Sequence, residues 1–259
     1  MRTRHLKKTT LCLAGSTLLA ATLASSASTV SLGTLTPFTG GDVGEGLDLS
    51  GNVVYALNLG GTAQTVQGVN FAPAVLGAPP AGVTPSVGTS QFNYSAANPG
   101  GANGTEYGAT SNDGAMNTIS NSVWYQTNFT LDLAVTPGTQ YQLQLILQES
   151  FFQYQGAERR NFDISVETAP DTLSLAVDEL VLGQETNGAN EAGADQGLVY
   201  TYTFTAADNS FRIALDDSPA GLDGNAVLAG VVLTEQIPEP STIVLFGLGF
   251  LGSILRRRR

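Results

Sequence analysis

The chain has 259 residues, a formal net charge of −11 and only 13% charged residues. Residues 29–236 hold three arginines, no lysine and 21 of the 22 acidic residues, which gives this part a charge of −18. A phosphate backbone would repel so acidic a body, so a nucleic-acid partner is not expected, and the basic residues at the two ends indicate a membrane instead.

Residues 1–28 have the order of a secretory signal peptide. Four Lys and Arg residues precede the apolar run LCLAGSTLLAATLA, and small residues follow it, with cleavage expected near residues 27–28. The signal predicts passage through Sec-type export machinery; an uncleaved anchor helix is the alternative. His5 and Cys12, the chain's one histidine and one cysteine, lie in this segment. The exported form would therefore lack thiol and imidazole catalysis, disulfides, and zinc sites built on His or Cys.

The body reads as an all-β domain over residues 52–236, a β-sandwich or jelly roll, after an irregular lead-in at 29–51. In YQLQLILQ, the residues from Tyr141 to Leu147 alternate between an apolar face and a face of glutamines that would point to solvent. The same period of two recurs in NFDISVE, LVYTYTFT and FRIAL, and Gly, Pro and Asn turns separate these runs.

Two parts of the body fit this pattern poorly. Residues 68–122 have the composition of long loops, which would form one rim of the sandwich. Residues 173–182 are ambiguous between a strand and a short helix.

Acidic side chains in the body suggest two sites, each with a simpler alternative. Asp216, Asp217 and Asp223 could supply oxygen ligands to a structural Ca²⁺, although their spacing is not that of an EF-hand loop, and a solvated acidic turn is the default. No other cofactor is expected. Glu149 and Asp163 could act as a glycosidase pair, but paired carboxylates arise by chance in so acidic a chain.

The adjacent cations Arg159 and Arg160 could clamp an anion or a carbohydrate. The alternative is a salt bridge from Arg160 to Glu149 across paired strands. A buried pair of that kind would fix register more than it would add stability.

Residues 237–259 explain the basic C-terminal end. The triplet Pro238, Glu239 and Pro240 precedes an apolar run of about 15 residues, which is shorter than the roughly 20 of a typical spanning helix. The cluster Arg256, Arg257, Arg258 and Arg259 follows, and the positive-inside rule would keep it cytoplasmic.

This order resembles the PEP-CTERM sorting signal. The resemblance implies recognition by a membrane enzyme of the exosortase type. It also implies a short membrane-anchored stage, cleavage near the Pro-Glu-Pro triplet, and delivery to the cell surface or extracellular matrix.

A second resemblance covers residues 52–235 and is strongest at residues 124–167. VVYALNLGG resembles the opening strand and glycine turn of malectin-like domains, and FRIALDDSPAGLDGNAVLAGVVLTE resembles their final strand pair. Between them, the block from LAVTPG to NFDISVE is similar to the most recognisable part of malectin. The matching positions are Glu149, Gly156, Arg160, Phe162 and Asp163. The segment before Glu149 departs from the family pattern, and residues 68–122 do not align.

The malectin resemblance implies a sandwich lectin that holds a glucose-type oligosaccharide or other exopolysaccharide in a loop-lined cleft. Independently of it, sugars stack on aromatic rings and bind amide and carboxylate groups. The candidate sugar-binding residues are Tyr94, Tyr107, Trp124, Tyr125, Phe152, Tyr154, Asp223 and Asn225. Trp124 has a core anchor as its alternative role.

Three functions therefore remain open for the body. The first is a secreted carbohydrate-binding protein, which would not be an enzyme. The second is a structural or adhesion protein of the polysaccharide matrix without a specific sugar site. The third is a glycan hydrolase.

Overall fold

The computed structural model describes residues 32–38, 46–94, 112–149, 160–182, 191–192, 197–217 and 224–236. Within these ranges the chain is mostly β-strand, as the period-two pattern predicts, and the strands form three sheets. The predicted signal peptide and sorting segment lie outside the described residues. None of the helices in the described part is long and apolar enough to cross a membrane.

The largest sheet has seven strands in the order β1-β13-β9-β16-β2-β4-β3. Their bounds are β1 Thr34–Pro37, β2 Asn52–Leu59, β3 Gln64–Val66, β4 Val69–Ala74, β9 Gln140–Leu147, β13 Leu198–Thr205 and β16 Gly230–Glu235. Neighbouring strands are antiparallel except for β2 and β4.

The second sheet has six strands in the order β12-β11-β10-β14-β8-β5, and the third has three in the order β15-β7-β6. The bounds are β5 Val83–Pro85, β8 Asn128–Ala134, β10 Arg160–Ala169, β11 Thr172–Leu182, β12 Glu191–Ala192 and β14 Ser210–Asp217 for the second sheet, and β6 Ser90–Asn93, β7 Ser122–Gln126 and β15 Ala226–Leu228 for the third. The ambiguous segment 173–182 is therefore strand.

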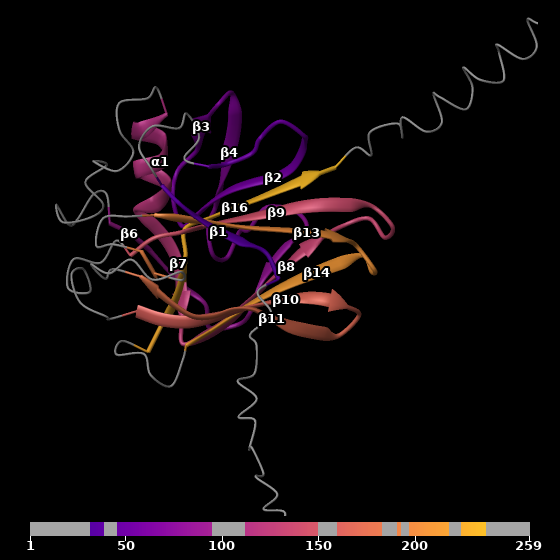
Figure 1. The fold of residues 1–259 in the computed structure, drawn as a ribbon. Helices are drawn as coiled ribbons and strands as arrows, with labels where there is room; N and C mark the ends of the chain where they lie inside the picture. The colour runs from indigo at the N-terminus through magenta and orange to yellow at the C-terminus, as the bar shows by residue number, and fades with distance from the viewer. Residues whose placement is uncertain are drawn as a thin grey trace, which may run out of the picture.

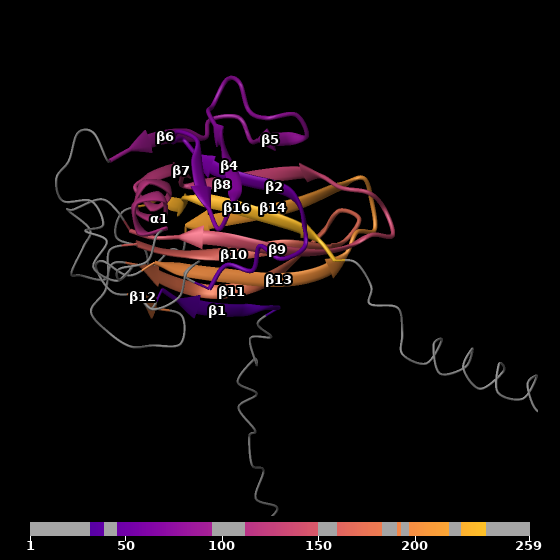
Figure 2. The ribbon, with the colours of Figure 1, turned by 90° about the horizontal axis from the view of Figure 1, so that it is seen from above.

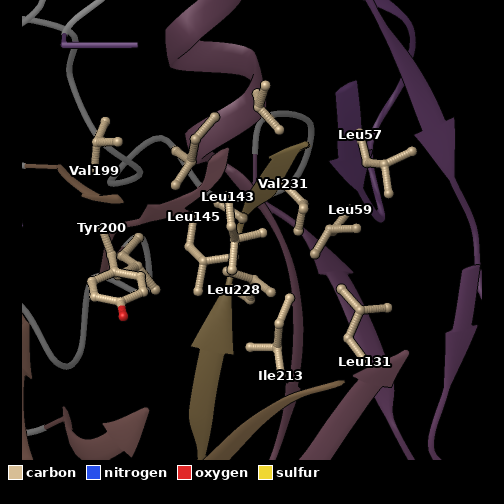
Figure 3. Close-up of a cluster of buried hydrophobic side chains, with 14 of the residues drawn as sticks. Leu57, Leu59, Leu131, Leu143, Leu145, Val199, Tyr200, Ile213, Leu228 and Val231 are labelled. Atoms are coloured by element: carbon tan, nitrogen blue, oxygen red, sulfur yellow. The ribbon is translucent and has the colours of Figure 1, made fainter. Parts of the chain in front are cut away.

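The seven-stranded and six-stranded sheets form the two layers of a sandwich (Figure 1). The predicted apolar face of β9 packs inward, where Leu143, Leu145 and Leu147 are fully buried. From the other layer, Leu131 and Ile213 enter the same cluster (Figure 3). Burying one such side chain contributes about 1.5–3 kcal/mol, so this alternation alone provides a strong drive to form the sandwich.

The glutamine face of β9 is not exposed as predicted. Gln144 and Gln148 are each only 1% exposed. Residues 46–50 fold over the outer face of the sheet, where the Asp48 N–H donates to Gln144 Oε1 at 3.1 Å and Gln144 Nε2 donates to the Gly46 carbonyl at 3.5 Å. An amide side chain can be buried here because backbone groups satisfy both its donor and its acceptor.

The lead-in at 29–51 is more ordered than expected. Its residues Thr34–Pro37 form β1, which pairs with β13 at the edge of the seven-stranded sheet. Leu47 and Leu49 are buried. The folded domain therefore begins before residue 52.

The expected loop at 68–122 holds the strands β4, β5 and β6 and the helix α1 (Asp113–Ser120). These strands are short and show little alternation, so pairing with β2, β8 and β7 stabilises them rather than their own pattern. The α1 residues Met116 and Ile119 are fully buried. Figures 1 and 2 place α1 on the outer side of the seven-stranded sheet, at one end.

The sandwich has two distinct ends. The Arg160 end is where β9, β11 and β14 finish and where β10, β13 and β16 begin, on the left of Figure 1. The tail end is the opposite one, where β16 finishes at Glu235. The third sheet lies at the Arg160 end.

Candidate functional site

Arg160 connects the three sheets at one point. It is the first residue of β10 in the six-stranded sheet, and its Nε donates to Glu149 Oε2, just beyond β9 of the seven-stranded sheet. Its second nitrogen, Nη1, donates at 2.7 Å to the carbonyl of Asn225, which precedes β15 of the third sheet. The two charged side chains are 4% and 1% exposed.

The predicted salt bridge between Arg160 and Glu149 is thus confirmed, with one correction. The pair does not cross two paired strands, because β9 and β10 belong to different sheets. It connects the two layers of the sandwich, and the carbonyl of Asn225 attaches the third sheet to the same guanidinium. Asn225 is one of the predicted sugar-binding residues, and the structure places it here, with its backbone carbonyl bound to Arg160.

Several predicted ligand residues fall outside the described part of the chain. These are Tyr107, Phe152, Tyr154, Asp223 and the sorting-motif residues Pro238, Glu239, Pro240 and Arg256–Arg259. The described residues that flank 150–159 are Glu149 and Arg160, and those that flank 218–223 are Asp217 and Gly224. Both pairs lie at the Arg160 end.

A row of aromatic residues lies on one face of the three-stranded sheet. Phe92 on β6 lies opposite Val123, and Tyr125, two residues further along β7, lies on the same face. The Tyr94 ring follows at 4.6 Å from Phe92, centroid to centroid. Phe92 is 39% exposed, Tyr125 is half-buried and Tyr94 is buried. This face thus carries two predicted residues, Tyr94 and Tyr125, and a third, Phe92, that the sequence analysis missed.

Trp124 occupies the opposite face of β7. It is fully buried, and its indole Nε1 donates at 3.1 Å to the carbonyl of Ala74. With its ring enclosed and its N–H satisfied, Trp124 has the features of a core anchor rather than of a sugar-stacking residue.

The structure describes two of the three proposed calcium ligands. Asp216 and Asp217 are consecutive on β14, so their side chains point to opposite faces of the sheet, and Asp223 lies outside the described residues. Among the residues that the structure describes, no group of three or more His, Cys, Asp or Glu side chains could hold a metal ion.

The proposed glycosidase pair is also separated. Glu149 is buried against Arg160 inside the sandwich. Asp163 lies on the outer face of β10, where its Oδ1 accepts the N–H of Glu179 at 2.9 Å. The φ of Glu179 is +49°, at a bulge in β11, so Asp163 supports an irregularity in the sheet.

A hollow of about 230 Å³ lies at the tail end, on the outer face of the six-stranded sheet. It is lined by Asp132, Glu167, Asp171, Thr172, Leu173, Asp208, Ser210 and Arg212. Arg212 donates to both carboxylate oxygens of Asp132, at 2.7 and 2.9 Å, and this pairing raises the pKa of its guanidinium. Burial raises the pKa of Glu167. No spacing pattern marked these residues, because four separate strands and turns bring them together.

Comparison with known proteins gives one sequence match and a set of structural matches. Residues 236–259 match the family model of the PEP-CTERM protein-sorting motif. A search of curated proteins found no match to this chain.

The fold is similar to three crystal structures at low sequence identity. The plant receptor-like kinase ANX2 matches with a TM-score of 0.52 at 13% identity, over 80% of this chain and 55% of that one. The ANX2 ectodomain from Arabidopsis thaliana gives 0.51 at 14% identity, over 72% and 50%. A chain of the complex of the plant peptide RALF23 with FER and LLG2 gives 0.50 at 14% identity, over 76% and 53%.

This chain spans about half the length of these structures, and at such identity the likeness concerns the fold alone. The PEP-CTERM motif implies export and processing at the membrane by an exosortase. The chain therefore combines a PEP-CTERM sorting motif with a domain that has the fold of the malectin-like ectodomains of the ANX and FER receptor kinases.

Proposed function

We propose that this chain is a surface or matrix protein whose malectin-like domain binds neutral carbohydrate at the Arg160 end. Export and exosortase processing would deliver the domain outside the cell, after a stage in which residues 237–259 hold it at the membrane. The body carries a charge of −18 between residues 29 and 236, which favours neutral glycans over anionic ones. We propose no catalytic activity.

The observation that carries the proposal is the aromatic row of Phe92, Tyr94 and Tyr125. An aromatic ring that is 39% exposed and supported from one side by a second ring at 4.6 Å is a rigid platform. The C–H face of a hexose can stack on such a platform, and nearby polar groups can bind its hydroxyls. The third sheet that presents this row is fixed to the sandwich through Arg160.

A glycan array probed with residues 29–236, which contain all the described strands, tests the proposal. We expect binding to neutral glucose-type oligosaccharides and a loss of about tenfold or more in affinity on Phe92→Ala, since stacked aromatic contacts dominate such sites. Leu175→Ala is the matched control, because Leu175 is a similarly exposed apolar residue on the six-stranded sheet, 40% exposed.

The array also separates the alternatives. A folded domain that binds no glycan would favour a structural role in the polysaccharide matrix. Release of sugar from any glycan would favour a hydrolase. Equal affinity of Phe92→Ala and the unmodified domain would move the site away from the aromatic row.

A further inference from the structure

We infer that the membrane enzyme that processes the sorting motif also binds the folded domain, at the tail end of the sandwich and through the hollow lined by Asp171 and Asp208. This inference rests on the proposed processing, but it concerns a surface of the folded domain that the motif does not include. It follows from where the motif leaves the fold and from the charge of the surface beside that point.

The sorting motif leaves the domain directly from a central strand. β16 is paired on both sides, with β2 and β9, up to Glu235. The next residue, Gln236, still donates its N–H to the carbonyl of Gln140 at 2.9 Å. The motif begins at this same residue, because the family model matches residues 236–259.

The distance available between fold and motif is therefore very small. Pro238 follows Gln236 by two residues, and two fully extended residues span at most about 7 Å. An enzyme that holds Pro238 to Pro240 in its active site must consequently touch the tail end of the sandwich. A flexible spacer that would let it avoid the domain is missing from this stretch of sequence.

The surface at that end is continuous with the acidic hollow. Gln140 is the first residue of β9, directly after the turn that follows β8, and Gly138 of that turn donates its N–H to the carbonyl of Ala206 at 2.8 Å. Val135 donates likewise to the carbonyl of Asn209 at 3.0 Å. Residues 206–209 thus lie beside the turn next to the tail, and Asp208, in the same segment, lines the hollow.

The lining of the hollow selects a basic partner. It contains four carboxylates and one arginine, and that arginine is engaged by both oxygens of Asp132. Asp171, Asp208 and Glu167 leave an excess of negative charge that a lysine or arginine side chain of the enzyme would complement. The volume of about 230 Å³ accommodates one such side chain.

The partner we commit to is the enzyme, not the chain's own arginines. Arg256 to Arg259 follow the apolar run and are expected on the cytoplasmic side of the membrane, away from the exported domain. A basic patch on the outward face of the enzyme would also align the domain, so that the triplet enters the active site in one orientation.

The test is the rate at which the full-length precursor is converted to the processed form in cells that express the exosortase, followed by pulse-chase labelling. The variant Asp171→Asn/Asp208→Asn removes two charges from the hollow. Asp171 has a φ of +56°, which asparagine tolerates well. An asparagine side chain in place of Asp208 can still accept the bond that the carboxylate takes from the Asn209 N–H. We expect conversion to slow by about threefold or more.

The control Glu179→Gln/Asp216→Asn removes two exposed charges from the same sheet towards the Arg160 end and should leave the rate unchanged. A Gly/Ser linker of about ten residues after Gln236, about 17 Å in root-mean-square length, should remove the difference between the hollow variant and the unmodified chain. Thermal unfolding of the purified domains verifies that both variants fold.

Equal conversion of the unmodified chain and Asp171→Asn/Asp208→Asn at native spacing would overturn the docking surface while leaving the processing intact. Equal slowing by the control variant would also overturn it, since net charge alone would then explain the rate. A precursor that the exosortase does not convert at all would overturn both this inference and the proposed processing.

Discussion

Arg160 and Glu149 form an ion pair that joins the two layers of the sandwich at one end. Ten residues, 150–159, separate Glu149 from Arg160 in sequence, and the pair holds these two flanking positions together. The same guanidinium binds the carbonyl that precedes β15. One side chain therefore positions parts of three sheets.

Replacing Glu149 with Gln tests the importance of this pair. The substitution removes the counter-charge from a buried guanidinium, so we expect the free energy of unfolding to fall by about 3–5 kcal/mol. Asp132→Asn breaks the pair with Arg212, whose side chain is 47% exposed, and should cost no more than about 1 kcal/mol. Denaturant titrations of both variants measure the difference.

Salt provides the check on this prediction. Added NaCl should reduce the effect of Asp132→Asn and leave that of Glu149→Gln almost unchanged, because exposed charges are screened and buried ones are not. If the two variants lost similar stability, Arg160 would not hold the layers together.

The sequence predicted the large sheets well because their strands follow a simple rule. Each long strand has one apolar face, so alternation in β9, β13, β10 and β14 indicated both the strands and the core. The rule fails where an outer face is also covered. The alternation predicts that Gln144 faces solvent. Its side chain is buried because residues 46–50, almost a hundred positions earlier in the sequence, cover it.

The residues of the candidate site were predictable only in part. The stacking of sugars on aromatic rings predicts Tyr94 and Tyr125, but the prediction leaves out Phe92, although Ser90, Phe92 and Tyr94 share the period of two that marks a strand face. Trp124 was ambiguous because its neighbour Tyr125 lies on the other face, and one residue of register decides which ring is enclosed.

The glycine turn after β2 provides a second prediction. A Cβ on Gly61 would collide with the side chains of Asn58 and Ser122, which hydrogen-bond to each other inside the domain. Gly61→Ala should therefore lower the free energy of unfolding by about 1–3 kcal/mol through overpacking. Gly114→Ala in α1 is the control: a Cβ there meets nothing within 4 Å, and alanine should stabilise the helix by up to about 1 kcal/mol.

Both glycine variants can be compared by thermal unfolding, where they should shift the midpoint in opposite directions. A neutral Gly61→Ala would mean that the Asn58–Ser122 contact can relax around a methyl group, and that the glycine is not required by packing at this turn.

A third prediction concerns the cover over the seven-stranded sheet. Gln144→Ala removes both hydrogen bonds to residues 46–48, and leaving these part-buried backbone groups without their partners costs about 1 kcal/mol. Amide hydrogen exchange across residues 46–51 should become faster than in the unmodified chain. Gln140→Ala, on the exposed end of the same strand, should not change this exchange; faster exchange in both variants would point to the strand rather than to the cover.

The fourth prediction concerns pH. Burial raises the pKa of Glu167 above its ordinary value of 4.5, and Asp171 and Asp208 add to the rise against an opposing effect of Arg212. The folded state thus binds this proton more tightly than the unfolded chain, so the charged form destabilises the fold above the folded pKa, and this penalty disappears as the pH falls below 4.5. Glu167→Gln should therefore raise the melting temperature at neutral pH and have little effect in acid.

Asp48 should show the opposite behaviour and serves as the matched comparison. Hydrogen bonds from the hydroxyl of Ser50 at 2.6 Å and from its N–H at 3.0 Å lower the pKa of Asp48 below 3.8. Its charged form therefore stabilises the fold above 3.8, and this stabilisation is lost as the pH falls through the lowered pKa. Asp48→Asn should lower the melting temperature at neutral pH, with the difference from the unmodified chain shrinking in acid. Shifts of the same sign for Glu167→Gln and Asp48→Asn at neutral pH would contradict one of the two assignments, because the pKa values of the two carboxylates shift in opposite directions.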